Sequence, residues 1–399
     1  MMTRCSALGA LAIPLLLAAG RPAVAKPCND PTIVNPIYGL GGSASKPFLA
    51  KLSTALAKLS GADQATIVFQ SPGACVGIYG VIDDTKITGT ASYWDASGVE
   101  QTCDLPAGGQ AIDFANMANS AALCSQAPNP LPAEIGDYEG PVNSIDFVVP
   151  LASSQVAISA AAGYFVFGFG TAGQAAPWVN ESLIFIRDQN SAVQQLLGVA
   201  INVPAEKWTH GVNALNQNGV ITKVAAASDP EAAIGIVSGE AADGARDKVR
   251  ILAYQHYGQS CGYLPDSTST AFDKRNVRDG HYYVWTPQHF FARKDAITGE
   301  IVSPSARKLI GYITGDVALP AGFDLLTLEI QANTVPKCAM KVWRSGDLGP
   351  LVKYTPPRSC AGYFESLKGS TTGLTACPGG PSDCPSSAPA CNYGYCEVQ

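Results

Sequence analysis

GGSASKPFLAKLSTALAKL, residues 41–59, places two glycines and two serines directly before an apolar stripe. The stripe has helical spacing and consists of Phe48, Leu49, Leu52, Leu56 and Leu59. Gly61 ends the predicted helix. The small residues before the helix have two interpretations. Either Ser45 is a plain N-cap, or the unpaired N–H groups and partial positive charge of the helix start hold an anion.

The same order of strand, small or polar turn, and helix recurs along the chain. Ser71–Cys75 follows a β-rich run at 65–70, Asp113–Asn119 overlaps a strand at 111–116, and Arg187–Ser191 separates a strand at 182–188 from a helix at 191–200. Further strands are expected at 144–159, 232–239, 248–254 and 281–286. This alternation predicts an α/β fold with parallel sheets and helices on their faces. Ligands bind beyond the carboxyl ends of such strands, so the four turns could converge on one small anion.

The first 25 residues have the features of a secretory signal peptide. Arg4 gives a positive start, 7–19 is apolar, and Ala23–Ala25 is a small-x-small cleavage site. The apolar run is too short for a stable membrane span, which needs about 20 residues. Removing Arg4 and Arg21 leaves 24 basic and 32 acidic residues, a net charge of −8, which argues against nucleic-acid binding. We expect a periplasmic or secreted protein, cleaved after Ala25.

The mature chain holds 11 cysteines, which in an exported protein mostly form disulfides and leave at least one thiol over. After about Tyr354 the chain is rich in Gly, Pro and Ser and cannot bury much apolar area, so bridges must hold it. Its cysteines are Cys360, Cys377, Cys384, Cys391 and Cys396. Four could pair locally, with the fifth reaching Cys338 or staying free. Zinc ligation is the alternative, but the segment has no histidine and no CxxC pair. We expect no metal and no cofactor.

Four stretches carry a family resemblance: GGSASKPFLAKL (41–52), VFQSPGACVG (68–77), IDFANMANSA (112–121) and IFIRDQNSAVQQ (184–195). In this order they resemble the ligand loops of the periplasmic phosphate-binding proteins of ABC transporters, a type 2 periplasmic binding protein group. AIGIVSGEAAD (233–243) and HYYVWTP (281–287) fit the same layout, so the resemblance spans about 33–335. It implies two α/β lobes, joined by crossing strands, that close over an oxyanion held by helix-start N–H groups, hydroxyls and one arginine.

The resemblance assigns ligand-binding residues by position. They are Ser43, Ala44, Ser45, Gly73, Ala74, Cys75, Asn119, Arg187, Ser191 and Ala192. Two of them also have a structural interpretation: Arg187 could form an ion pair inside the protein, and Ser191 with Gln194 could form a capping box.

Three positions depart from the family pattern. Val193 replaces a Thr hydroxyl, and Ala74 replaces a serine. Ala118 or Asn119 stands where the family has an aspartate that accepts the proton of hydrogen phosphate, and Asp113 lies at the wrong end of its strand. We therefore expect this chain to bind phosphate poorly or not at all.

The sequence also predicts how the lobes divide. The extended stretch Val148–Val156 is expected to cross between lobes, and Tyr282–Thr286 to cross back. The first lobe is then 26–153 with 287–340, the second is 154–286, and 341–399 is a linker with the Cys-rich tail.

Enzyme motifs are weak in this chain. Ser43-Ala44-Ser45-Lys46 matches the S-x-x-K pattern of penicillin-binding enzymes, but no K-T-G follows. Cys75 could be a nucleophile, although a disulfide is the simpler expectation for an exported protein. None of the histidines, His210, His256, His281 and His289, lies in a catalytic motif.

Three functions remain as hypotheses. The first is an exported solute-binding protein that captures a small anion between its lobes, acts as a monomer and serves an ABC permease. The second is a surface or adhesion module on the same fold with a degenerate site. The third, remote one is a serine acyl-transfer enzyme that uses Ser43 and Lys46.

Overall fold

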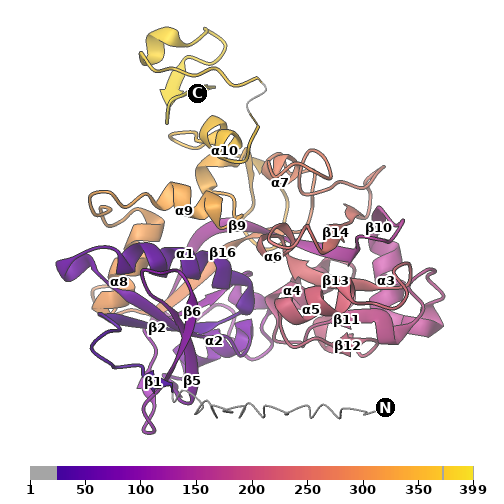
Figure 1. The fold of residues 1–399 in the computed structure, drawn as a ribbon, viewed down its shortest axis with the longest axis horizontal. Coiled ribbons are helices and arrows are strands. Elements are labelled where there is room, and N and C mark those ends of the chain that lie inside the picture. The colour runs from indigo at the N-terminus through magenta and orange to yellow at the C-terminus, as the bar shows by residue number, and fades with distance from the viewer. Residues whose placement is uncertain (1–24, 371–372, 399) are drawn as a thin grey trace, which may run out of the picture.

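A computed structural model describes residues 25–370 and 373–398 of the chain. Its centre is one twelve-stranded sheet in the order β1-β6-β5-β3-β2-β8-β16-β9-β13-β11-β12, with β14 also paired to β9. Figure 1 shows helices on both sides of this sheet and a C-terminal segment that extends away from the body. The signal peptide predicted at 1–25 lies almost entirely outside the described residues.

Lobe 1 is the part built on three parallel strands, β2 (Pro36–Gly41), β3 (Thr66–Gln70) and β8 (Phe114–Met117). Two antiparallel strands, β5 (Thr90–Trp94) and β6 (Glu100–Asp104), extend it. The predicted helix is α1 (Lys46–Ala57), and its apolar stripe packs on one face together with α8 (Pro304–Thr314). On the other face lies α2 (Ala74–Ile82). Both faces of the sheet are therefore covered, as parallel strands require.

Lobe 2 is built on β13 (Ile234–Ser238), β11 (Ile184–Ile186) and β12 (Val212–Asn213), which run parallel to one another. The helix expected at 191–200 is α4 (Ala192–Ala200), and it lies in the same core as α3 (Ala160–Phe169). The opposite face carries α5 (Gln217–Ala225). The predicted α/β fold with two lobes and helices on both faces is confirmed.

Two strands connect the lobes. β9 (Ile135–Pro150) pairs with β16 (Trp285–Arg293) up to Ser144 and with β13 from Ile145 onward. The crossing strand thus begins earlier than Val148, and it ends at Pro150. Beyond it, Glu231 accepts hydrogen bonds from the Ser154 N–H and the Gln155 side chain, which hold 151–156 as a loop instead of a strand. The lobe boundaries drawn from the sequence, 26–153 with 287–340 and 154–286, stay a prediction.

Short elements complete the body. They are β1 (Lys26–Pro27), β4 (Lys86–Ile87), β7 (Gln110–Ala111), β10 (Ala157–Ser159), α6 (Gly239–Asp243), β14 (Val249–Ile251), β15 (Ala253–Gln255), α7 (Arg275–Arg278) and α9 (Leu325–Gln331). No helix within 25–370 or 373–398 is long and apolar enough to cross a membrane.

The C-terminal part is held by disulfides, as predicted. It contains β17 (Val342–Trp343), β18 (Val352–Lys353), α10 (Ala361–Leu367), β19 (Ala390–Asn392) and β20 (Tyr395–Glu397). Cys377 pairs with Cys391, Cys384 with Cys396, and Cys360 reaches back to Cys338. The sulfurs of Cys377, Cys384 and Cys396 lie within 4.8 Å of one another, but each is already in a disulfide, so they are not free to bind zinc.

The body has two more disulfides, Cys28–Cys103 and Cys75–Cys124. Of the 11 cysteines in the described residues, only Cys261 is free, and it is exposed. The expected odd thiol is therefore Cys261, and the interpretation of Cys75 as a nucleophile is wrong because its sulfur is oxidised.

Candidate functional site

The predicted ligand loops meet between the two lobes. The Arg187 guanidinium of lobe 2 donates to the Ser43 hydroxyl of lobe 1 at 3.5 Å. The Asn119 side chain of the third loop donates to Gln195 on α4 at 2.8 Å. Of the ten predicted site residues, all but Ser43 are buried. The loops that the sequence placed at strand ends are thus neighbours in the structure.

Arg187 is a buried cation without an acidic partner. Arg187 comes directly after β11 and is 5% exposed. No carboxylate within the described residues forms a salt bridge with it. Burial lowers the pKa of the guanidinium, only partly opposed by the charge of Asp188, and its Nε has no hydrogen-bond partner. Because a buried, unpaired charge is costly, the ion-pair interpretation fails and the arginine is left able to bind an anion.

The serines near Arg187 are not capping residues. Ser45 precedes α1 and is fully buried, but its hydroxyl makes no capping bond and has no partner at all. Ser191 precedes α4, also without a side-chain cap. Its expected capping-box partner, Gln194, instead accepts from the Arg187 backbone N–H and donates to the Ala205 carbonyl. The plain N-cap and capping-box interpretations are therefore both wrong.

The second loop is closed by protein atoms. The Cys75 N–H in the first turn of α2 donates to the Asn190 carbonyl of lobe 2 at 3.2 Å. The Gln195 amide lies 2.7 Å from the Cys75 sulfur and also donates to the Gln189 carbonyl. Gly73 and Ala74 precede Cys75 in this turn, and a Cβ placed at Gly42 would lie 3.3 Å from that of Ala74. The Cys75 N–H of this helix start is therefore not free for a ligand.

The third loop supplies no carboxylate. Asn119 is fully buried, with its Oδ1 unpartnered. Asp113 accepts from the Tyr38 N–H and the Ser303 hydroxyl, so it ties the strand to α8, away from the loop. The third loop thus offers a neutral amide oxygen in place of a carboxylate, and the expected loss of phosphate selection stays a prediction.

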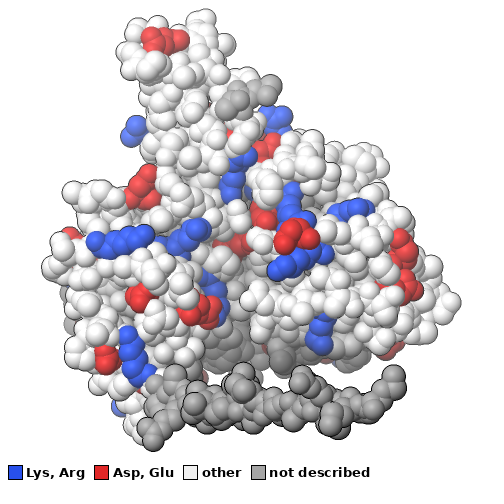
Figure 2. Space-filling view, viewed as in Figure 1, with Lys and Arg blue, Asp and Glu red and all other residues white. Residues whose placement is uncertain are grey.

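Sequence reasoning missed Asn190, Gln194 and Gln195, which join the lobes or hold Arg187. The only signal is their position in the polar run Gln189–Ser191 and the Gln pair that follows it. Next to the loops, a cleft of about 780 Å³ lies between the lobes. It is lined by Ser43, Lys46, Ser71, Gln217, Glu240 and Lys248 among others. On the face drawn in Figure 2, acidic and basic side chains are interspersed without one extended patch of a single sign.

Lys46 is not placed to act as the base of Ser43. Its ammonium pairs with Glu100 at 2.6 Å and contacts the Ser92 hydroxyl at 3.4 Å. No hydrogen bond joins Lys46 to Ser43 within the described residues, so the two side chains are not arranged as base and nucleophile.

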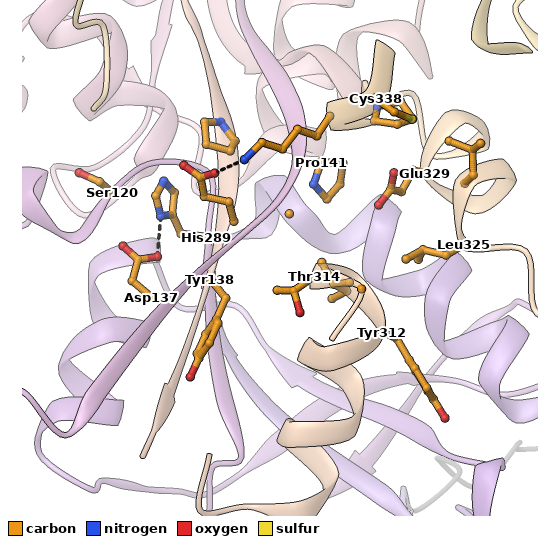
Figure 3. Close-up of a pocket in the computed structure, with 18 of the residues that line it drawn as sticks. Ser120, Asp137, Tyr138, Pro141, His289, Tyr312, Thr314, Leu325, Glu329 and Cys338 are labelled. Atoms are coloured by element: carbon orange, nitrogen blue, oxygen red, sulfur yellow. Dashed lines mark hydrogen bonds and ion pairs between the residues drawn. The ribbon is translucent and has the colours of Figure 1, made fainter. Parts of the chain in front are cut away.

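A second and larger cavity of about 1140 Å³ is lined by residues of β9, β16, α8 and α9 (Figure 3). Its lining includes Ser120, His289 and Asp137, and His289 Nδ1 lies 2.7 Å from Asp137 Oδ1. Burial opposes protonation of His289, but the hydrogen bond and charge of Asp137 outweigh it and raise the histidine pKa. No hydrogen bond joins Ser120 to His289 within the described residues, so the three side chains do not form a catalytic triad.

The fold and the loop geometry define a two-lobed periplasmic binding protein architecture. Among solved structures, the chain is similar to a protein named as a phosphate ABC transporter substrate-binding protein from Clostridium perfringens, with bound phosphate. The TM-score is 0.52 at 12% identity, covering 76% of this chain and 99% of that one. It is also similar to an ABC-type phosphate transport receptor from Vibrio cholerae, with a TM-score of 0.48 at 10% identity, over 76% of this chain and 100% of that one.

At 12% identity, the similarity to the Clostridium perfringens structure establishes the fold alone, and the predicted phosphate-binding-protein-like fold is confirmed. No protein-family model matches the chain, and no curated protein matches it.

Proposed function

We propose that the protein is an exported solute-binding protein that captures a small anion between its lobes. The observation that supports this is the buried Arg187, which has no carboxylate partner in the part of the chain that the structure describes and donates to Ser43 across the lobe boundary. An anion would neutralise the guanidinium and accept from the free Ser45 hydroxyl. The Clostridium perfringens protein of the same fold holds phosphate.

The anion is expected to be fully ionised. Among the ten proposed site residues, none carries a carboxylate that could accept a proton from the ligand. In addition, the Cys75 N–H already donates to the Asn190 carbonyl and is not free to donate to a ligand. Val193 and Ala74 supply no hydroxyl. The missing carboxylate and the two missing hydroxyls, at about 1 kcal/mol each, weaken phosphate binding roughly a hundredfold or more. Sulfate or a small carboxylate, which needs no acceptor, should then bind at least as well as phosphate.

The mechanism would be capture without chemistry. The ligand would exchange its water for the guanidinium and hydroxyls, and the joined lobes would exclude solvent around it. The protein would act outside the cytoplasm, where ten paired cysteines are stable, and would deliver its ligand to an ABC permease. The chain would work as a monomer, with no nucleic acid, metal or cofactor.

Calorimetry on residues 26–399 with phosphate, sulfate and acetate at neutral pH tests the proposal. Saturable binding of at least one anion is expected, and Arg187→Gln should weaken it by about a hundredfold, since the charged hydrogen bonds are lost. The matched control is Arg275→Gln, an exposed arginine on α7. Submicromolar phosphate binding with sulfate excluded would contradict the predicted selectivity, and binding unchanged by Arg187→Gln would contradict the site.

One contact favours a second candidate, a surface or adhesion module with a degenerate site. It is the bond from Cys75 to Asn190, because it fills a helix start that a ligand would otherwise use. Absence of binding for every anion in the calorimetry would support this candidate. A permease and an ATPase encoded next to this chain would instead support transport.

A further inference from the structure

The larger cavity, lined by His289 and Glu329 among others, is built by segments that are distant in the sequence. The crossing strands β9 and β16 form one wall, α8 and α9 a second, and the segment around 336–347 a third. Its volume of about 1140 Å³ lies at the upper end of the range for small-molecule sites. None of the ten proposed anion-site residues lines it.

Three of the four carboxylates that line this cavity have an ion-pair or hydrogen-bond partner. Asp137 pairs with His289 at 2.7 Å, and Glu139 pairs with Lys337 at 2.8 Å. Asp347 accepts from the Ser120 N–H at 2.7 Å and from the Thr286 hydroxyl at 2.6 Å. The exception is a fourth carboxylate, that of Glu329.

Glu329 on α9 is 8% exposed and lines the cavity. Its carboxylate accepts no hydrogen bond and forms no salt bridge within the described residues. Figure 3 shows it beside Pro141 and Leu325, with its oxygens directed toward the cavity. Desolvation by burial raises the pKa of Glu329 to about 8. A cation brought into contact with the carboxylate would reverse this shift, because the opposite charge favours the ionised form.

Arg344 is the other charged lining residue that needs a partner, but it is compensated differently. Its guanidinium lies over the Trp285 ring at 4.0 Å, and it donates to the Tyr283 carbonyl. Its unpartnered Nε and Nη2 atoms are buried out of contact with solvent.

The surroundings of Glu329 are apolar and aromatic. The lining on its side includes Ile313, Val317, Leu319, Leu325 and Leu326, and three tyrosines, Tyr138, Tyr312 and Tyr393, complete it. Apolar walls favour a ligand with a hydrocarbon body.

We propose that this cavity is a second ligand site, for a small organic ammonium ion whose charged group pairs with Glu329 and whose apolar body packs against α8 and α9. The ammonium would pair with the one lining carboxylate that has neither a hydrogen bond nor a salt bridge within the described residues. The site is independent of the anion site, so either proposal can fail alone.

The test is calorimetry on residues 26–399 with phenethylammonium as the probe, 2-phenylethanol as its neutral analogue and phenylacetate as its anionic one. Phenethylammonium should bind at least about tenfold more tightly than either analogue. Glu329→Gln, which keeps the side-chain volume, should weaken the binding of phenethylammonium by about tenfold and leave the binding of 2-phenylethanol unchanged. Glu134→Gln, at an exposed position outside the cavity, is the matched control.

The pH dependence gives a second readout. The titratable and charged groups that line the cavity are Asp137, Glu139, His289, Glu329, Lys337, Arg344, Asp347 and the three tyrosines. Because protons compete with the ammonium for Glu329, binding should strengthen between about pH 6 and 9, and this gain should shrink in Glu329→Gln. The proposal is overturned by no saturable binding up to about 10 mM, by equal binding of the neutral analogue, or by unchanged affinity in Glu329→Gln.

Discussion

The Cys75 N–H of lobe 1 donates a hydrogen bond to the Asn190 carbonyl of lobe 2 at 3.2 Å. The same cysteine touches the Gln195 amide through its sulfur and is bridged to Cys124. One residue at a helix start thus connects two chain segments of lobe 1 with two residues of lobe 2. These contacts within the chain form where a helix start could otherwise hold a ligand. The lobes are therefore held together directly at this point.

Gln195→Ala should destabilise the protein. The substitution removes the bonds from Gln195 to Asn119, to the Cys75 sulfur and to the Gln189 carbonyl. Asn119 is fully buried and would lose its partner, which costs about 1–3 kcal/mol. Urea unfolding measures the change. Gln189→Ala is the control, because that side chain is exposed and only its backbone carbonyl is used, so a change within about 0.5 kcal/mol is expected. Equal effects of the two substitutions would refute the role of Gln195.

Replacing both Cys75 and Cys124 by serine should lower the stability of the body. The disulfide closes a loop with a sequence separation of 49, for which the chain-entropy relation gives about 4 kcal/mol. Thermal unfolding with oxidised samples is the measurement. The control is the double substitution Cys384→Ser and Cys396→Ser, which removes a tail disulfide with a sequence separation of 12. That pair should leave the main transition unchanged, and a large shift of this transition would show that the tail stabilises the body.

Asp146 should make stability fall as pH rises. It is completely buried on β9, neither of its oxygens has a hydrogen-bond partner, and burial raises its pKa to about 7. The folded state therefore holds a proton that the unfolded state has already released. This contribution is complete below the unfolded pKa near 4 and is lost as pH rises through about 7.

Asp146→Asn should consequently raise stability by about 1 kcal/mol or more at pH 8 and change it little at pH 4, as measured by chemical denaturation. The neighbouring buried network, Lys274 and Arg246 with Asp243 and Asp266, keeps two charges of each sign. Destabilisation at pH 8 would mean that Asp146 is ionised and pairs with Lys274.

Glu365→Gln should loosen α10 from the body. Glu365 accepts from the guanidinium of Arg278 at 2.8 Å, and Arg278 is 1% exposed. Removing the acid leaves a buried cation with only carbonyl partners, which costs about 3–5 kcal/mol. Limited proteolysis of 340–398 and thermal unfolding report the loss. Lys341→Gln, which breaks the exposed pair with Asp279, should change stability by less than about 1 kcal/mol.

The elements that were predictable from the sequence have strong local patterns. The apolar stripe from Phe48 to Leu56 is α1, and the runs at 65–70, 191–200 and 232–239 are β3, α4 and β13. The extent of β9 was not predictable, because its first ten residues are strand through pairing with β16, which lies about 150 residues later. Local pattern carries no information about such a partner.

The candidate site was predictable only in part. Ser43, Arg187 and Asn119 lie in loops that the resemblance locates, and the structure brings these loops together. The Asn190 contact uses a backbone carbonyl, so no side-chain motif marks it. The cavity at Glu329 is built by several chain segments that are distant in the sequence, and it has no sequence motif.

The continuity of β9 decides what kind of motion the lobes can make. Its hydrogen bonds to β16 end at Ser144 and those to β13 begin at Ile145, so each end of one strand is clamped in a different lobe. Parting the lobes must therefore twist a paired strand, as a torsion spring is twisted, and cannot proceed by free rotation about a loop. The elastic energy of the twisted strand rises with the square of the opening angle. The molecule therefore returns to one equilibrium geometry. Small openings are then cheap and reversible, and wide ones require breaking ladder hydrogen bonds next to Ser144.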